Sequence, residues 1–216
     1  MKYLIFSDSH LSDTFDINKF NFLKNIINNS DRVIINGDFW EGYDFSIEEF
    51  VNSKWNNLFK LLIAKKAIYL FGNHDKKEYS NNKVKEFSVK QLQKLTIKSG
   101  YKTFYLEHGD RIVPEWDKYF KRMPRFINKT LYYVEKTLVT LFEMRLVGIL
   151  YKRFNEKMIE KVAKKLKKNE FLVCGHSHFM EFDEKNHFIN SGIIKHGIGQ
   201  YITIDDGNIK LHSERY

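Results

Sequence analysis

The chain has 216 residues, of which 43% are hydrophobic and 29% are charged. This composition excludes an intrinsically disordered chain, and the length suits one domain with a sizeable core. No stretch approaches the roughly 20 consecutive apolar residues of a membrane-spanning helix, and the first apolar run is too short for a signal peptide. The single cysteine, Cys174, excludes an internal disulfide, so we expect a cytoplasmic protein.

The net charge of +9 comes from one segment of the chain. Residues 111–170, called the basic block below, contain 16 Lys and Arg against 7 Asp and Glu, whereas the remainder is balanced. Such an asymmetry indicates an anionic partner, either the surface of an anionic membrane or a nucleic acid backbone. A helix face that only contacts solvent is the alternative interpretation.

The first half of the chain alternates between strand and helix patterns. Three short apolar runs, each followed by a polar or glycine-containing turn, predict buried strands at residues 2–7, 32–36 and 67–71. Between them, Asp16 can cap one helix, and Ser46 with Glu49 forms a capping-box pattern that opens another, continuing to Leu62. This alternation predicts βαβ units and a mostly parallel sheet.

The second half contains a long helical pattern between β segments. Another strand is expected at residues 102–107. Residues from about 116 to 168 have a helical pattern, with one apolar face formed by Phe154, Met158, Ile159, Val162 and Leu166. The last part is β structure, with a strand at 171–174, a hairpin around 183–186, and two strands at 201–204 and 209–212.

Five short motifs combine aspartate, asparagine and histidine, and each stands where an apolar run ends. They are Asp8-Ser9-His10, Gly37-Asp38, Gly72-Asn73-His74-Asp75, His108-Gly109-Asp110 and Gly175-His176-Ser177-His178. Oxygen and imidazole ligands without thiolate suit manganese, iron, zinc or magnesium better than a structural zinc site. A carboxylate such as Asp38 can give one oxygen to each of two ions about 3.5–4 Å apart. The motifs therefore predict a site for two metal ions.

These motifs resemble, in full and in order, the pattern of the calcineurin-like metallophosphoesterase family: D-x-H, GD, GNH-[DE], a lone His, and GH-x-H. The resemblance implies an α/β fold, a four-layer α/β/β/α sandwich of two mixed sheets. We expect one domain over residues 1–216, with the basic block as a helical insertion, or cap. The implied activity is metal-dependent hydrolysis of a phosphoester or phosphoanhydride bond.

The resemblance also assigns the metal ligands. The first metal would be held by Asp8, His10, Asp38 and His178. The second would be held by Asp38, Asn73, His108 and His176. Manganese is the expected metal, and iron, zinc and magnesium are alternatives.

The expected reaction follows from this ligand set. A hydroxide that bridges the two ions would attack phosphorus, and the ions would neutralise the phosphoryl oxygens. His74, which is next to a ligand but is not itself one, would protonate the leaving oxygen. In phosphatase members of the family an acid three residues after the aspartate of the GD motif orients this histidine, so the resemblance implies that Glu41 orients His74. Asp75 follows a ligand and could either bind a histidine N–H group or cap a loop.

Within the family, the layout is most similar to that of the bacterial UDP-2,3-diacylglucosamine pyrophosphatases, which are peripheral-membrane, manganese-dependent hydrolases. The segments that carry this similarity are residues 37–41, the basic block and Asn190-Ser191-Gly192. It implies a lipid or nucleotide-sugar substrate, with Arg122 and Arg125 as substrate contacts and the protein at the inner face of the membrane. Those enzymes have arginine at the position of His74. The alternative is a phosphodiesterase or nuclease that acts on nucleotides or DNA.

Overall fold

The computed structural model describes residues 1–114, 127, 130, 133–137 and 145–216. Seven strands form the first sheet, in the order β10-β11-β1-β2-β3-β4, with β12 paired to β11. They are β1 (Tyr3–Phe6), β2 (Arg32–Asn36), β3 (Ile68–Leu70), β4 (Lys90–Leu92), β10 (Ile194–Lys195), β11 (Ile198–Asp205) and β12 (Asn208–Arg215). Strands β1 to β4 run parallel, and β11 runs antiparallel to β1, so this sheet is mixed.

The second sheet has five strands in the order β5-β6-β7-β9-β8. They are β5 (Leu95–Ser99), β6 (Lys102–Leu106), β7 (Glu170–Cys174), β8 (Glu181–Asp183) and β9 (Phe188–Asn190). The three central strands are parallel, and the two edge strands are antiparallel to their neighbours. Both sheets are therefore mixed, as the family resemblance implies.

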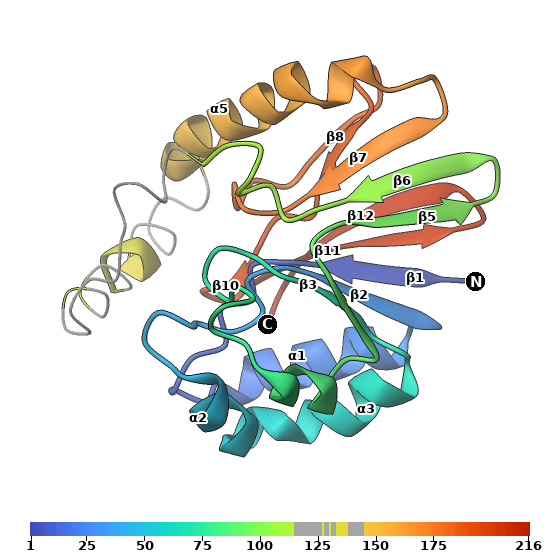
Figure 1. The fold of residues 1–216 in the computed structure, drawn as a ribbon. Helices are drawn as coiled ribbons and strands as arrows, with labels where there is room; N and C mark the ends of the chain where they lie inside the picture. The colour runs from blue at the N-terminus through green and yellow to red at the C-terminus, as the bar shows by residue number, and fades with distance from the viewer. Residues whose placement is uncertain (115–126, 128–129, 131–132, 138–144) are drawn as a thin grey trace.

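Helices cover the outer face of each sheet (Figure 1). Three of them, α1 (Ile17–Asn28), α2 (Ile47–Asn52) and α3 (Phe59–Ala64), lie on the first sheet, and α5 (Arg145–Lys161) lies across the second. Successive residues of a strand point to opposite faces. Accordingly, Leu4 and Phe6 of β1 pack toward the helices, whereas Tyr3 and Ile5 enter the core between the sheets. The predicted four-layer sandwich is confirmed.

The two predicted helix starts are confirmed. The Asp16 carboxylate accepts hydrogen bonds from the backbone N–H groups of Asn18 and Lys19, at 2.9 and 3.1 Å, and so caps α1. Ser46 and Glu49 form the reciprocal capping box at the start of α2. In both cases a short polar side chain satisfies backbone N–H groups that have no partner inside the helix.

The predicted continuous helix from Ser46 to Leu62 is wrong. It is divided into α2, a 3-10 helix at Lys54–Leu58 and α3. The division falls at Ser53, whose backbone is extended and whose hydroxyl donates to Phe50 O at 2.7 Å and accepts from Trp55 N at 3.3 Å. A serine hydroxyl that bonds the local backbone competes with the helix and starts a new turn.

The long helical pattern is only partly reproduced among the described residues. Helix α5 ends at Lys161 and is followed by a 3-10 turn at Ala163–Lys165, so the helix stops short of residue 168. Its predicted apolar face is confirmed, because Met158 and Ile159 are buried against β7 and β9. Most of the segment before α5 lies outside the described residues, and the division into one domain with a cap stays a prediction. Strands β4, β5 and β10 were not predicted.

No helix in the described ranges is long and apolar enough to cross a lipid bilayer.

Candidate metal centre

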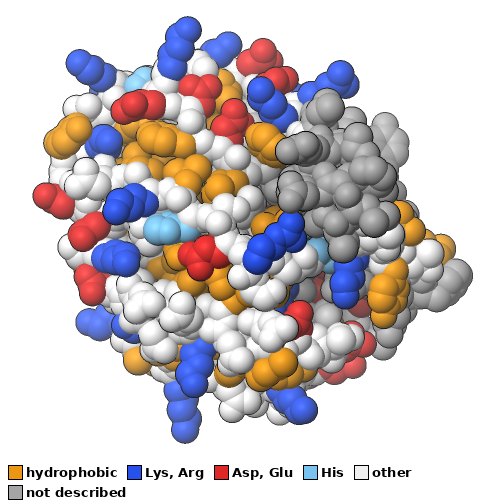
Figure 2. Space-filling model, turned by 180° about the vertical axis from the view of Figure 1, so that it is seen from behind, with side chains coloured by type: hydrophobic (Ala, Val, Ile, Leu, Met, Phe, Trp, Pro, Cys, Tyr) orange, Lys and Arg blue, Asp and Glu red, His pale blue; other side chains and the backbone are white. Residues whose placement is uncertain are grey.

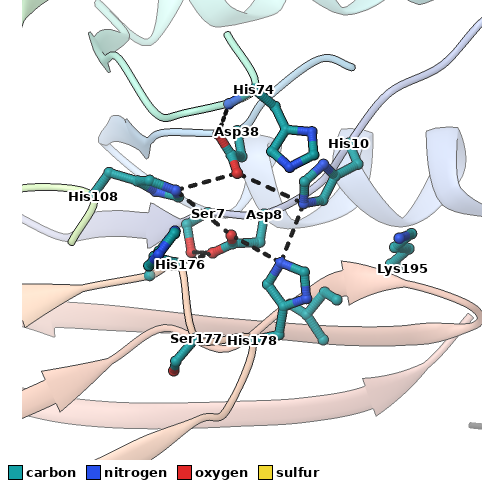
Figure 3. A network of polar contacts seen from close by, with 12 residues as sticks. Ser7, Asp8, His10, Asp38, His74, His108, His176, Ser177, His178 and Lys195 are labelled. Atoms are coloured by element: carbon teal, nitrogen blue, oxygen red, sulfur yellow. Dashed lines mark hydrogen bonds and ion pairs between the residues drawn. The ribbon is translucent and has the colours of Figure 1, made fainter. Parts of the chain in front are cut away.

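The five motifs meet where strands of both sheets end (Figure 3). The residues follow β1 (Asp8 and His10), β2 (Asp38), β3 (Asn73), β6 (His108) and β7 (His176 and His178). All of these strands are parallel to a neighbour within their sheet, so their carboxyl ends lie on one side of it. This common edge explains why side chains distant in sequence are brought together.

The Asp38 carboxylate lies at the middle of the cluster. Its Oδ2 atom is 3.2 Å from His108 Nε2 and 3.8 Å from His10 Nε2, and its Oδ1 atom accepts the backbone N–H of His74 at 2.9 Å. The Asp38 side chain is 2% exposed. One buried carboxylate therefore faces an imidazole from each of the two predicted ligand sets.

Asp8 also faces histidines from both predicted ligand sets. Its Oδ1 atom is 3.3 Å from His178 Nε2 and 3.9 Å from His108 Nε2. The atom is fully buried and has no hydrogen-bond partner among the described residues. His178 Nε2 is also 3.3 Å from His10 Nε2. A buried carboxylate oxygen surrounded by imidazole nitrogens is expected to be compensated by a cation, so this donor set fits a metal ion.

The Asn73 side chain brings two further histidines together. Its Oδ1 atom is 3.1 Å from His108 Nε2 and 2.9 Å from His176 Nδ1. An amide oxygen beside two imidazole nitrogens suits a divalent ion. The other ring nitrogen of His108, Nδ1, lies 2.9 Å from Asn36 O, which fixes the orientation of the ring.

Among the described residues, three groups of side chains have ligand atoms within 4.8 Å of one another, close enough to hold a metal ion. They are Asp8, His10 and His178; Asp8, Asp38 and His108; and His10, Glu41 and His74. The first two groups contain only predicted ligands. The third contains the predicted proton donor and its partner.

The pKa shifts of Asp8, His10 and His176 favour metal binding. Burial raises the pKa of Asp8, but the facing His108 and His178 imidazoles outweigh it and bring the pKa to about 2. Burial lowers the pKa of His10 and of His176 to about 4 in each case. Ionised carboxylates and neutral imidazoles are the forms in which these side chains bind metals.

The surroundings of His108 show that the cluster favours positive charge. Burial lowers the pKa of His108, but the Asp38 and Asp8 carboxylates reverse the effect and raise it well above the ordinary value. The same two carboxylates that raise this pKa would favour a divalent ion beside them.

Most of the candidate ligands have a strained backbone. Five of them have positive φ values: Asp8 (51°), His10 (41°), Asp38 (51°), His176 (66°) and His178 (59°). Left-handed backbone at a residue other than glycine costs about 1–3 kcal/mol and is concentrated at functional sites. Gly72 and Gly175 allow the loops to approach closely, since a Cβ atom would collide with Asp38 at Gly72 and with Ser7 and Asp8 at Gly175.

Asp75 holds two of the motif loops together. Its carboxylate accepts the backbone N–H groups of Gly72, Asp38 and Phe39 at 2.7, 3.1 and 2.6 Å. Of the two roles considered from the sequence, these contacts correspond to loop capping. They connect the loop after β2 to the loop after β3.

Glu41 and His74 are in direct contact. His74 Nδ1 is 2.6 Å from Glu41 Oε1, and the other oxygen, Oε2, is 3.1 Å from His10 Nδ1. The His74 side chain is 26% exposed, against 3% for His10. Burial lowers the pKa of His74, but the Glu41 and Asp38 carboxylates outweigh it and raise the pKa to about 9. His74 is therefore a protonated group at the open side of the cluster.

Two predicted site residues, Arg122 and Arg125, lie outside the described residues. The ligand motifs, in turn, do not include several buried polar residues that support the loops. Ser7 donates to Asp8 Oδ2 and contacts the Ser191 hydroxyl at 2.7 Å. Asn155, on α5, bonds to the Ser177 hydroxyl at 2.6 Å. Asn155 precedes Met158 and Ile159 by three and four residues, so its place on an apolar helix face was the available signal.

The chain belongs to the calcineurin-like phosphoesterase family, whose profile matches residues 1–180. No curated protein matches the chain. Among solved structures, the phosphoesterase Yfce from E. coli is 16% identical, with 98% of each chain covered and a TM-score of 0.51. A dimetal phosphatase from Danio rerio is 8% identical, with 100% of this chain and 96% of that chain covered and a TM-score of 0.51. These structures share the fold, and the family confirms the prediction of a phosphoesterase.

Proposed function

We propose that this protein hydrolyses phosphoester or phosphoanhydride bonds with the help of two divalent metal ions. The first ion would be held by Asp8, His10, Asp38 and His178, and the second by Asp38, Asn73, His108 and His176. Manganese is the metal we expect, although iron, zinc and magnesium suit the same oxygen and imidazole donors.

The observation that carries this proposal is the position of Asp38 between the two predicted ligand sets. Its Oδ2 atom faces both His108 and His10, at 3.2 and 3.8 Å. A carboxylate in this place would be shared by both ions. Two bound ions supply a nucleophile from water near neutral pH and neutralise charge on the phosphoryl oxygens.

His74 is the proposed proton donor to the leaving oxygen. Glu41 orients its ring through the 2.6 Å contact at Nδ1 and leaves Nε2 for the substrate. A protonated imidazole with part of its surface in solvent can reach a leaving group that arrives from outside. In this role His74 contacts the substrate, and Glu41 acts through His74.

For the substrate, we propose a lipid-linked or nucleotide-sugar pyrophosphate of the kind that UDP-2,3-diacylglucosamine pyrophosphatases hydrolyse. The motif layout and the positive charge of the basic block support this choice, with Arg122 and Arg125 as contacts for phosphate groups. Tyr133 and Val134, in the same block, are 64% and 51% exposed, next to the exposed Lys136. Exposed apolar side chains beside a cation suit contact with an anionic membrane at its inner face.

A nuclease or phosphodiesterase is the alternative, and it would use the basic block as a track for a nucleic acid backbone. On the face shown in Figure 2, Lys and Arg side chains are interspersed with Asp and Glu. The described residues of this face therefore form no continuous cationic track.

The test compares three substrates with manganese present: bis-p-nitrophenyl phosphate, UDP-2,3-diacylglucosamine in detergent, and labelled single- and double-stranded DNA. We expect turnover of the lipid pyrophosphate, and none by Asp38→Ala, which lacks the central carboxylate. DNA degradation without lipid turnover would establish the nuclease instead. If none of the three substrates is hydrolysed, the proposed function is contradicted.

A further inference from the structure

Helix α5 contacts the two-histidine loop through the ring of Tyr151, whose centroid lies 5.6 Å from that of His178, and through a buried amide. Asn155 is fully buried. Its Nδ2 atom donates to Phe179 O at 3.0 Å and to Glu181 Oε2 at 2.8 Å. Its Oδ1 atom accepts from Ser177 Oγ at 2.6 Å and from Asn190 Nδ2 at 3.0 Å. An amide has two N–H donors and two acceptor lone pairs, so all of the capacity of Asn155 is used.

Ser177 stands between two candidate metal ligands, His176 and His178. Its side chain points away from the ligand cluster (Figure 3) and is 2% exposed. Asn190 supports the same loop from β9, because its Nδ2 atom also approaches Gly175 O at 2.8 Å and Ser177 Oγ at 3.0 Å. The back of the loop is therefore held by hydrogen bonds from two amide side chains.

The residue after Asn190 continues this support toward the first sheet. The Ser191 hydroxyl is 2.7 Å from the Ser7 hydroxyl, and Ser7 donates to Asp8 Oδ2. The backbone N–H of His176 donates to the same oxygen at 3.0 Å. These bonds occupy Oδ2 and leave Oδ1 of Asp8 facing the histidines.

The loop needs this support because its backbone is strained. His176 and His178 have φ values of 66° and 59°, in the left-handed region that favours glycine. Such a conformation persists only where the surrounding contacts enforce it. Without the bonds to Ser177, the loop could relax, and the two imidazoles would no longer point at Asp8 and Asn73.

We infer that Asn155 is a positioning residue that holds the His176–His178 loop in its metal-binding conformation, so that the docking of α5 sets the affinity for the divalent ions. This inference rests on the proposed function, since the loop conformation matters for metal only if these histidines bind it. Residues that orient metal ligands from behind are typically worth about 10–100-fold in metal affinity.

The test measures the manganese affinity of the full-length, metal-loaded protein by competition with a chelator. Four proteins are compared with the wild type: Ser177→Ala, Asn155→Leu, the double variant and the control Ser30→Ala. Ser30 is buried, donates its hydroxyl to Ile27 O at 2.8 Å and precedes β2, at the opposite end of the strand from Asp38. The control therefore loses a comparable hydrogen bond away from the cluster.

We expect Ser177→Ala and Asn155→Leu each to weaken manganese binding by roughly 10–100-fold, with Ser30→Ala unchanged. Because both residues act through one network, the double variant should bind manganese only slightly more weakly than the weaker-binding single variant. The visible absorption bands of the cobalt-loaded protein should change in Ser177→Ala and stay the same in Ser30→Ala. A general loss of stability would not produce this pattern.

Wild-type affinity in Ser177→Ala would overturn the inference and leave the proposed function intact. Fully additive losses in the double variant would also overturn it, since they would mean that the two residues act separately. If Asn155→Leu fails to fold, Ser177→Ala alone decides. If the wild type binds no divalent ion, the proposed function fails as well.

Discussion

The two sheets hold their metal-facing loops in different ways. On the first sheet, the loops after β2 and β3 are tied together by Asp75, which lies inside one of the motifs and accepts three backbone N–H groups. On the second sheet, the loop after β7 depends on Asn155, which belongs to no motif and comes from a helix. The comparison teaches that one half of the site is supported from within its motifs, whereas the other depends on the docking of a distant element.

Asp38 follows a strand of the first sheet but is the proposed ligand of both ions, so its removal should have the largest effect. Asp38→Ala should lose both ions and reduce turnover by far more than the roughly 10–100-fold typical of residues that only support a ligand. Metal content and turnover of bis-p-nitrophenyl phosphate check this together. A variant that keeps two ions per chain would break the account of a shared carboxylate.

His74 lies in the first half but is not a proposed ligand, so its removal should separate chemistry from metal binding. His74→Ala should reduce turnover by about 10²–10⁴-fold, the usual contribution of a positioned proton donor, and retain both ions. Glu41→Gln should have a smaller effect in the same direction, because His74 would still be present. Loss of metal in His74→Ala would instead indicate that the group of His10, Glu41 and His74 holds an ion.

Asp75→Asn tests how the first half is supported. An amide offers one acceptor oxygen in place of two, so at least one of the backbone N–H groups now bonded to Asp75 loses its partner. A buried donor left without a partner destabilises a fold by about 1–3 kcal/mol. Urea denaturation of the variant and the wild type measures this change. No change in the free energy of unfolding would mean that the loops are held by other contacts.

Ser46→Ala gives the smallest effect, because the capping box of α2 is an exposed feature at the outer layer. Loss of the cap should lower the free energy of unfolding by about 1 kcal/mol. Turnover and metal content should match the wild type. A loss of activity would show that α2 influences the ligand loops, although the described hydrogen bonds of Ser46 stay within the capping box and helix α2.

Much of the site could be predicted from the sequence because its information is local. Each ligand motif stands where an apolar run ends, and parallel strands bring such positions to one edge of a sheet. The assignment of Asp38 to the centre of the cluster depended on the family resemblance, and its place between His10 and His108 agrees with it.

Other features depend on contacts that the sequence pattern does not express. The positive φ values at Asp8 and His178 could not be predicted, because these residues adopt that conformation only when the rest of the fold enforces it. The break at Ser53 results from a hydroxyl that competes with the helix, although the apolar period continues through it. The role of Asn155 required knowledge of which loop lies under α5.

The central claim is that side chains from both sheets hold a pair of ions that shares Asp38. The most direct measurement is the number of divalent ions per chain in purified, active protein, taken before and after treatment with a chelator. We predict two ions per chain, loss of activity when they are removed, and recovery when manganese is returned. Full activity in protein with no bound divalent ion would contradict the account.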